Sequence, residues 1–269
     1  MTAWSMESLQ SEAVALQVVR AWHPDAPSGL QYHASTHLAA TVRLAMAFER
    51  EGKAVALELK PLAMYYALLN WLKAAIHLQE VSYPRSAHVM QHGVSVRRTK
   101  RANYRWPYDV LWLHREGVLQ SFRDAFCPGL ELPLRCRVGE LLASLPNLAV
   151  LLPPWYTSFQ ALPWRSRLAS RLAENNHPQD DTSIPGTQPA NRISAHRISP
   201  EEANNTQDVA LTLIHFGLLY SLSALARYHP VEWSDIVHWN NDIDAALVRQ
   251  YVSYVAEWRP PVLHRLLQF

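Results

Sequence analysis

The sequence predicts a mainly α fold: a helical, bundle-like core with one β-hairpin insertion and one long flexible loop. Apolar residues recur at steps of three and four along most of the chain, the spacing of amphipathic helices. Two apolar runs within residues 109–122 are strand-like, and residues 174–208 are polar with few large apolar side chains. With 269 residues, 49% hydrophobic and 18% charged, the chain is long enough for one large core. We therefore expect a single domain over residues 1–269.

Helices in the first half are expected over residues 4–22, 33–51 and 62–79. Pro24 lies just beyond the first helix and ends it. Ser35 or Thr36 is expected near the start of the second helix, and Gly52 just past its end. Pro61 precedes the third helix, the most apolar of this half, and proline is compatible with a first helical turn.

The middle of the chain changes character after the Tyr83-Pro84 break. A short helix is expected over residues 85–92. Residues 109–114 and 118–122 are apolar, β-leaning runs on either side of a turn that contains Gly117. This arrangement predicts the β-hairpin.

Further helices are expected over residues 138–145, 209–228 and 242–258. The intervening residues 174–208 are rich in Asn, Pro, Gln, Asp, Ser and Thr. Such a composition cannot bury enough apolar surface to order itself, so we predict a long, mobile surface loop there.

Residues 209–226 carry no formal charge over eighteen positions, the lower edge of membrane-spanning length. Four polar residues interrupt this stretch: Thr212, His215, Ser221 and Ser223. Polar insertions of this kind favour a buried core helix over a membrane span. We therefore expect no association with a membrane.

Composition excludes several classes of protein. A formal net charge of +2 excludes a strongly basic nucleic-acid binder, so any such role must depend on a local patch. Cys127 and Cys136 are too few for a disulfide scaffold or a four-thiolate zinc site. The N-terminal residues lack a secretory signal pattern, and we expect a reduced, cytoplasmic setting. No glycine-rich phosphate loop and no metal-binding motif occurs, so no cofactor or metal is expected.

Three blocks of sequence, in order, resemble the YaaC-like family. The first is the apolar helix at residues 61–75; the second runs from Tyr83-Pro84 through His92-Gly93-Val94-Ser95 into a basic segment; the third covers residues 215–233. The resemblance extends over about residues 4–269, with 174–208 the least comparable part. It implies a bacterial, cytoplasmic protein with the fold of that family. It implies no reaction, because the family has no established activity or cofactor.

The segment from Arg85 to His92 places an arginine and a histidine seven positions apart, on one face of the expected helix. This spacing is similar to the Arg-x4–6-His signature of HEPN domains, which implies a metal-independent ribonuclease site, usually formed across a dimer. In such a site His92 acts as general acid or base and Arg85 holds the phosphate. Ser86 departs from the asparagine that commonly follows the arginine. Two alternatives stay open: His92-Gly93 closes a helix, or the pair binds phosphate without catalysis.

A basic segment follows, interleaved with aromatic residues. Its predicted nucleic-acid-binding residues are Arg97, Arg98, Lys100, Arg101, Tyr104 and Arg105. Cations bind phosphates and aromatic rings stack on bases, which makes this composition suitable for nucleic acid. The alternative is a solvated loop whose aromatic residues fold into the core.

Polar residues on the apolar helix near the C-terminus form a second group of candidates. His215, Ser223 and Arg227 lie near one face of that helix, and buried polar groups require partners. Glu232 or the His92 segment could supply them. The group is either a structural hydrogen-bond network or part of a composite site with His92.

These patterns predict a HEPN-like protein that interacts with RNA or another nucleic acid. The leading hypothesis is a metal-independent endoribonuclease, or a component of a bacterial antiviral defence or stress system, with Arg85 and His92 as catalytic residues. The alternative is a non-enzymatic interaction or scaffold protein that binds a protein partner or a second copy of the chain. The sequence leaves open whether the protein is an enzyme.

Overall fold

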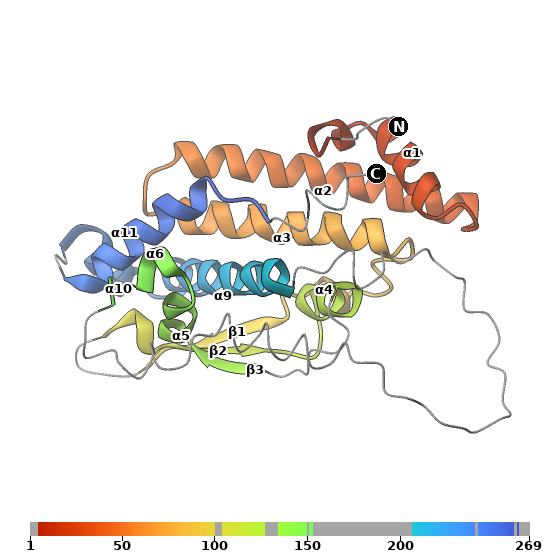
Figure 1. Ribbon diagram of the computed structural model, residues 1–269. Helices are drawn as coiled ribbons and strands as arrows, with labels where there is room; N and C mark the ends of the chain where they lie inside the picture. Colours follow the sequence, from red (N-terminus) through yellow and green to blue (C-terminus); the bar gives the residue numbers. More distant parts are fainter. Residues whose placement is uncertain are drawn as a thin grey trace, which may run out of the picture.

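The computed structural model describes residues 5–99, 104–126, 134–149, 151–152, 206–239, 242–260 and 263. Helices dominate this part of the chain, and a three-stranded antiparallel sheet lies along one side (Figure 1). The predicted mainly α class is confirmed. Most of the predicted loop at 174–208 lies outside the described residues, and its last three residues belong to a helix that begins at Thr206.

The upper layer is a pair of long antiparallel helices, α2 (Ser28–Ala54) and α3 (Lys60–Gln79) (Figure 1). A 3-10 turn, η1 (Glu7–Gln10), and helix α1 (Glu12–Trp22) pack on α2. Together they occupy the segment predicted as one helix over residues 4–22, because the chain bends at Ser11, which has extended backbone angles.

Helix α2 is longer than predicted at both ends. It begins at Ser28 because the carbonyl of Pro27 accepts the first helical hydrogen bonds, so Ser35 and Thr36 lie inside the helix rather than at its start. Gly52 also lies inside α2 rather than beyond it. A Cβ atom at this glycine would come within 2.4 Å of the Met64 sulfur, so α3 packs directly against the α2 backbone there.

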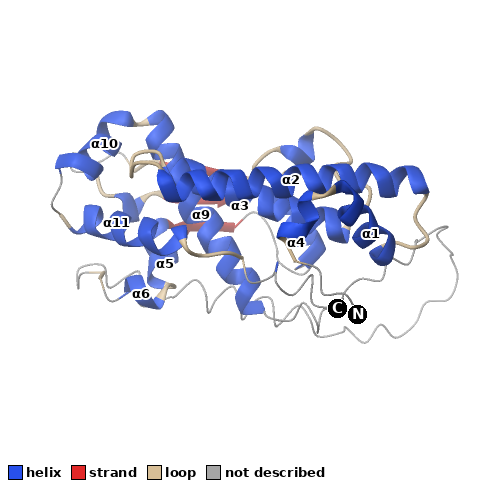
Figure 2. Ribbon diagram, turned by 90° about the horizontal axis from the view of Figure 1, so that it is seen from above, coloured by secondary structure: helices blue, strands red, loops and turns tan. Residues whose placement is uncertain are grey.

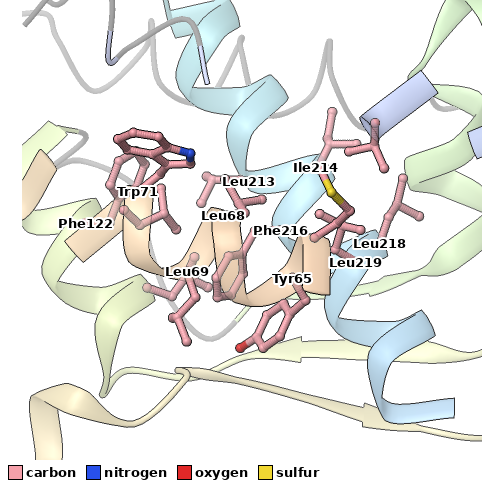
Figure 3. Close-up of a cluster of buried hydrophobic side chains, with 14 of the residues drawn as sticks. Tyr65, Leu68, Leu69, Trp71, Phe122, Leu213, Ile214, Phe216, Leu218 and Leu219 are labelled. Atoms are coloured by element: carbon pink, nitrogen blue, oxygen red, sulfur yellow. The ribbon is translucent and has the colours of Figure 1, made fainter. Parts of the chain in front are cut away.

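The central element is α9 (Thr206–Tyr228), which lies between α3 and the sheet (Figure 1). Figure 3 shows the apolar side chains that α3 and α9 contribute to this interface, with Phe122 joining from a neighbouring helix. Tyr65 lies at the edge of the cluster, and its hydroxyl points toward the strand layer (Figure 3). Among the described residues, one helix, Asp208–Tyr228, is long and apolar enough to cross a membrane, and 83% of its most apolar stretch is buried within the protein.

The sheet has the order β1-β2-β3, with strands β1 (Val94–Arg97), β2 (Val110–Leu113) and β3 (Leu134–Arg137). The predicted strand at 109–114 is thus present as β2. The second predicted strand, 118–122, is wrong: it lies in helix α4 (Val118–Phe126). Buried positions 118, 119, 122 and 126 recur at helical spacing, and this periodicity, rather than the β-leaning composition, decides the structure.

Short helices complete the described part of the chain. Helices α5 (Val138–Ala143) and α6 (Pro146–Ala149) follow the sheet, and α11 (Ile243–Ala256) follows a turn. Between α9 and α11 come α10 (Pro230–Ser234) and a π-helical turn, η5 (Asp235–Trp239). Viewed from above, α10 and α11 lie at the opposite end of the molecule from α1 (Figure 2).

Candidate catalytic and nucleic-acid site

The segment predicted as a helix over residues 85–92 is mostly irregular, with a single 3-10 turn, η2 (His88–Met90). Its backbone bonds to the chain after β2 instead: the Gln91 carbonyl accepts from the Val118 amide at 2.6 Å. The prediction that Arg85 and His92 share one helical face is therefore wrong. Arg85 is exposed and forms an ion pair with Glu80, and it does not line the pocket beside His92.

His92 is half-buried between α3 and α9. Its Nδ1 atom lies 2.8 Å from the Tyr65 hydroxyl, and its ring contacts those of Tyr65 and Tyr220 at centroid distances of 5.5 and 6.0 Å. Burial lowers the pKa of His92 below its usual value, and the positive charges of Arg227 and Lys73 lower it further. The imidazole is therefore neutral at neutral pH, with one nitrogen occupied by Tyr65. The other nitrogen, Nε2, has no hydrogen-bond partner in the described part of the protein.

An open pocket of about 710 Å³ adjoins His92. Its walls are residues 91–94, before and at the start of β1, and residues 114–116, just after β2. His114 is exposed at this wall, and its Nε2 lies 2.7 Å from the Ser95 hydroxyl. Three of the lining side chains can carry positive charge (His92, His114 and Arg115), and one, Glu116, carries negative charge.

Two glycines set the shape of this pocket. Gly93 has φ +74° and Gly117 has φ +98°, a region that favours glycine. A Cβ at Gly117 would lie 2.4 Å from the Gln91 carbonyl oxygen, and one at Gly93 would lie 2.7 Å from the Glu116 carbonyl oxygen. The two walls therefore meet backbone to backbone, which holds His92 and His114 at one opening.

Among the described residues of the predicted basic segment, two of the three cations form internal ion pairs. Lys100 and Arg101 lie outside the described residues. Arg98 forms an ion pair with Glu232 and lies over the Tyr104 ring, and the Arg105 Nε lies 3.1 Å from Asp244. Of the four predicted nucleic-acid-binding residues that the structure describes, Arg97 alone is exposed.

Aromatic residues of the same segment fold inward. The Tyr104 hydroxyl donates to Asp109 at 2.6 Å, and burial raises the pKa of that carboxyl group to about 6. Trp106 is fully buried; its indole donates to the Ser221 hydroxyl at 3.0 Å and its amide donates to Asp244 at 3.1 Å. These contacts match the alternative in which the aromatic residues belong to the core.

The predicted polar group on α9 divides into separate contacts. Arg227 donates to the Ser223 carbonyl at 3.1 Å, and its charge acts on His92. Glu232 pairs with Arg98. His215 is completely buried on another side of α9, where it contacts α11 through the Tyr251 hydroxyl at 3.3 Å. The structure thus brings Arg227 into the surroundings of His92 and leaves His215 in a separate part of the core.

One known protein family matches most of the chain. The family model described as YaaC-like Protein matches residues 7–208 and 190–267, most of the sequence. The chain belongs to this family. The resemblance inferred from three blocks of sequence is therefore confirmed. No curated protein and no solved structure matches the chain.

Four residues of this YaaC-like protein reach the His92 region without having been predicted: Tyr65, Lys73, His114 and Tyr220. Lys73 could have been selected from the sequence, because it is the one charged residue between Met64 and Ile76 of an apolar helix. Its amine is half-buried, which lowers its pKa, and it has no ion-pair partner among the described residues. His114 is the last residue of the predicted strand at 109–114, and only the pairing of that strand with β1 brings it beside His92.

Proposed function

We propose that this YaaC-like protein binds RNA at the His92 pocket and cleaves it without a metal ion. The observation that carries the proposal is His92 itself, a neutral histidine that is held by Tyr65 at the wall of an open pocket. Arg227 and Lys73 place positive charge around this histidine, and Arg115 lines the same pocket. Positive potential in a concave site attracts phosphate.

The chemistry requires groups that such a pocket contains. In RNA the 2′-hydroxyl is an internal nucleophile, so cleavage requires a base to remove its proton and cations to stabilise the phosphate. A neutral imidazole can act as this base near pH 7. Arg85, the phosphate-binding residue of the HEPN-like hypothesis, has no part in this proposal because it pairs with Glu80 at the surface.

The first test is cleavage of single-stranded RNA by the purified protein in the presence of EDTA. The wild type is expected to leave 2′,3′-cyclic phosphate ends, and His92→Ala is expected to slow the reaction by about 10²-fold, the usual contribution of a general base. His88→Ala is the matched control, because His88 is an exposed histidine on the preceding turn and does not line the pocket. Arg85→Ala should retain wild-type rates. A large loss of cleavage rate on Arg85→Ala would support Arg85 and His92 as the catalytic pair and contradict the site at the pocket.

RNA binding is measured separately by its salt dependence. Phosphate contacts release counterions, so affinity should fall steeply between about 50 and 200 mM salt. Arg97→Glu should weaken binding, since Arg97 is an exposed cation at the end of β1. Lys53→Glu is the control, because Lys53 is a surface cation at the end of α2 that pairs with Glu257. If the protein neither binds nor cleaves RNA, the proposed function is excluded.

A second candidate is a non-enzymatic interaction protein. Three large apolar side chains are unusually exposed between the end of α9 and η5: Tyr228 at 67%, Val231 at 70% and Trp239 at 77%. Exposed apolar side chains are typical of protein-binding surfaces where they form a contiguous patch. A stable protein complex that Trp239→Ser abolishes, together with no effect of Arg97→Glu on RNA, would favour this function.

A further inference from the structure

His114 and His92 are brought together by the pairing of β1 with β2. In this antiparallel register Val94 pairs with Leu113, and the His114 amide donates to the Gly93 carbonyl at 2.9 Å. The residue before Gly93 and the residue after Leu113 therefore lie at the same end of the strand pair. Both histidines line the same pocket of about 710 Å³.

We propose that His114 is a second catalytic residue, which protonates the leaving oxygen when His92 removes the proton from the 2′-hydroxyl. This inference rests on the proposed ribonuclease function and extends it to a two-histidine mechanism. It also defines the substrate class: a phosphodiester with a neighbouring hydroxyl, as in RNA, and not DNA.

The proposed step transfers the phosphorus from the 5′-oxygen to the 2′-oxygen. His92 accepts the 2′-hydroxyl proton, and the 2′-oxygen forms a bond to phosphorus. The bond between phosphorus and the 5′-oxygen breaks, and the electron pair stays with that oxygen, which takes a proton from the imidazolium of His114. The products are a 2′,3′-cyclic phosphate and a 5′-hydroxyl, and no oxidant, reductant or water is consumed.

The surroundings of the two histidines differ as their two roles require. His92 is half-buried and lies near Arg227 and Lys73, conditions that favour an uncharged base. His114 is exposed and its Nε2 atom lies 2.7 Å from the Ser95 hydroxyl, so Nδ1 is the ring nitrogen that the proposal assigns to the leaving group. The charged neighbours in the pocket are Arg115, which can bind the phosphate, and Glu116.

The test uses two substrates whose leaving groups differ in whether they need a proton from an acid. Dinucleotide RNA has an alkoxide leaving group that requires a proton, whereas uridine 3′-(4-nitrophenyl phosphate) releases a stable phenolate. We expect His114→Ala to slow RNA cleavage by about 10²-fold and cleavage of the nitrophenyl ester by less than about 5-fold. His92→Ala should slow both reactions, because both need the base.

Controls separate this inference from the function it extends. Ser95→Ala keeps the His114 imidazole and removes its hydrogen bond, so it should slow RNA cleavage far less than His114→Ala. Equal thermal unfolding midpoints would show that the variants remain folded. A wild type that cleaves both substrates and a His114→Ala variant that cleaves RNA equally well would overturn the role of His114 and leave His92 as base. A wild type that cleaves neither substrate would overturn both proposals.

Discussion

Gly117→Ala is expected to lower the free energy of unfolding by about 2–6 kcal/mol. A residue other than glycine at φ +98° is strained by about 1–3 kcal/mol, and overpacking adds about 1–3 kcal/mol more. The new Cβ atom would lie 2.4 Å from the Gln91 carbonyl oxygen and 2.6 Å from the Gly93 amide nitrogen. Both are backbone atoms, so no side-chain rotation relieves the collision. Urea unfolding at pH 7.5 measures the loss.

Gly29→Ala is the matched control for this prediction. Gly29 lies in the first turn of α2, and apart from its chain neighbours and the backbone of its own helix no described atom lies within 4 Å of the Cβ position. Alanine is the better helix former there, so stability should stay equal or rise by up to about 1 kcal/mol. A Gly117→Ala variant as stable as the wild type would contradict the close approach of the two pocket walls, and with it the arrangement of His92 and His114.

Much of the helical framework could be predicted because its apolar residues follow one period over many turns. Helix α3 and helix α9 are each predicted within three residues of their observed ends, since long apolar segments with helical spacing have few alternatives. The polar residues of α9 also indicated the correct environment. Ser221 and Ser223 bond back to carbonyl groups of their own helix, so they remain buried at little cost.

The errors share a physical cause, which is that tertiary contacts override short local patterns. Residues 118–122 contain β-leaning side chains, yet Val118 and Phe122 are four positions apart and face one core. Residues 85–92 have a local pattern that is compatible with a helix, but the Gln91 carbonyl bonds to the Val118 amide instead. A five-to-eight-residue pattern carries too little energy to resist such contacts.

The candidate site was predicted only in part for the same reason. His92 was selected from the sequence through its spacing to Arg85, which resembles the HEPN signature. Its partners Tyr65 and Tyr220 come from helices far along the chain, and they look like ordinary core residues in an apolar pattern. Arg85 and His92 are close in sequence, but proximity in sequence sets a shared face only inside a helix, and no helix forms there.

Acidification is expected to destabilise the fold through two buried histidines, His77 and His215. Burial lowers the pKa of each to about 3, compared with about 6.5 in an unfolded chain. His77 Nδ1 and His215 Nε2 have no hydrogen-bond partner among the described residues. Neighbouring positive charge from His37, His33 and Lys73 lowers the His77 pKa further, whereas burial alone acts on His215.

The sign of the effect follows from proton binding. Between pH 6.5 and 3 the unfolded chain binds protons at these two positions and the folded protein does not, so stability is complete above pH 6.5 and is lost as the pH falls. At pH 4.5 each histidine should cost about 2–3 kcal/mol. Asp109 acts in the opposite direction, because its raised pKa of about 6 lets the folded protein bind a proton at a higher pH than the unfolded chain does. This uptake offsets about 2 kcal/mol of the loss in stability.

The contribution of His215 can be isolated by His215→Phe, since a phenyl ring suits the surrounding rings of Tyr251, Tyr254 and Trp258 and does not titrate. The free energy of unfolding, measured in urea from pH 7.5 to 4.5, should fall by about 2–3 kcal/mol less in this variant than in the wild type. His88→Phe is the control, because His88 is exposed and its replacement should leave the slope unchanged. Equal slopes for the wild type and His215→Phe would mean that His215 takes up protons in the folded protein. Water would then have to reach its orphaned Nε2 atom, because a dry apolar surrounding cannot hold an imidazolium at pH 4.5.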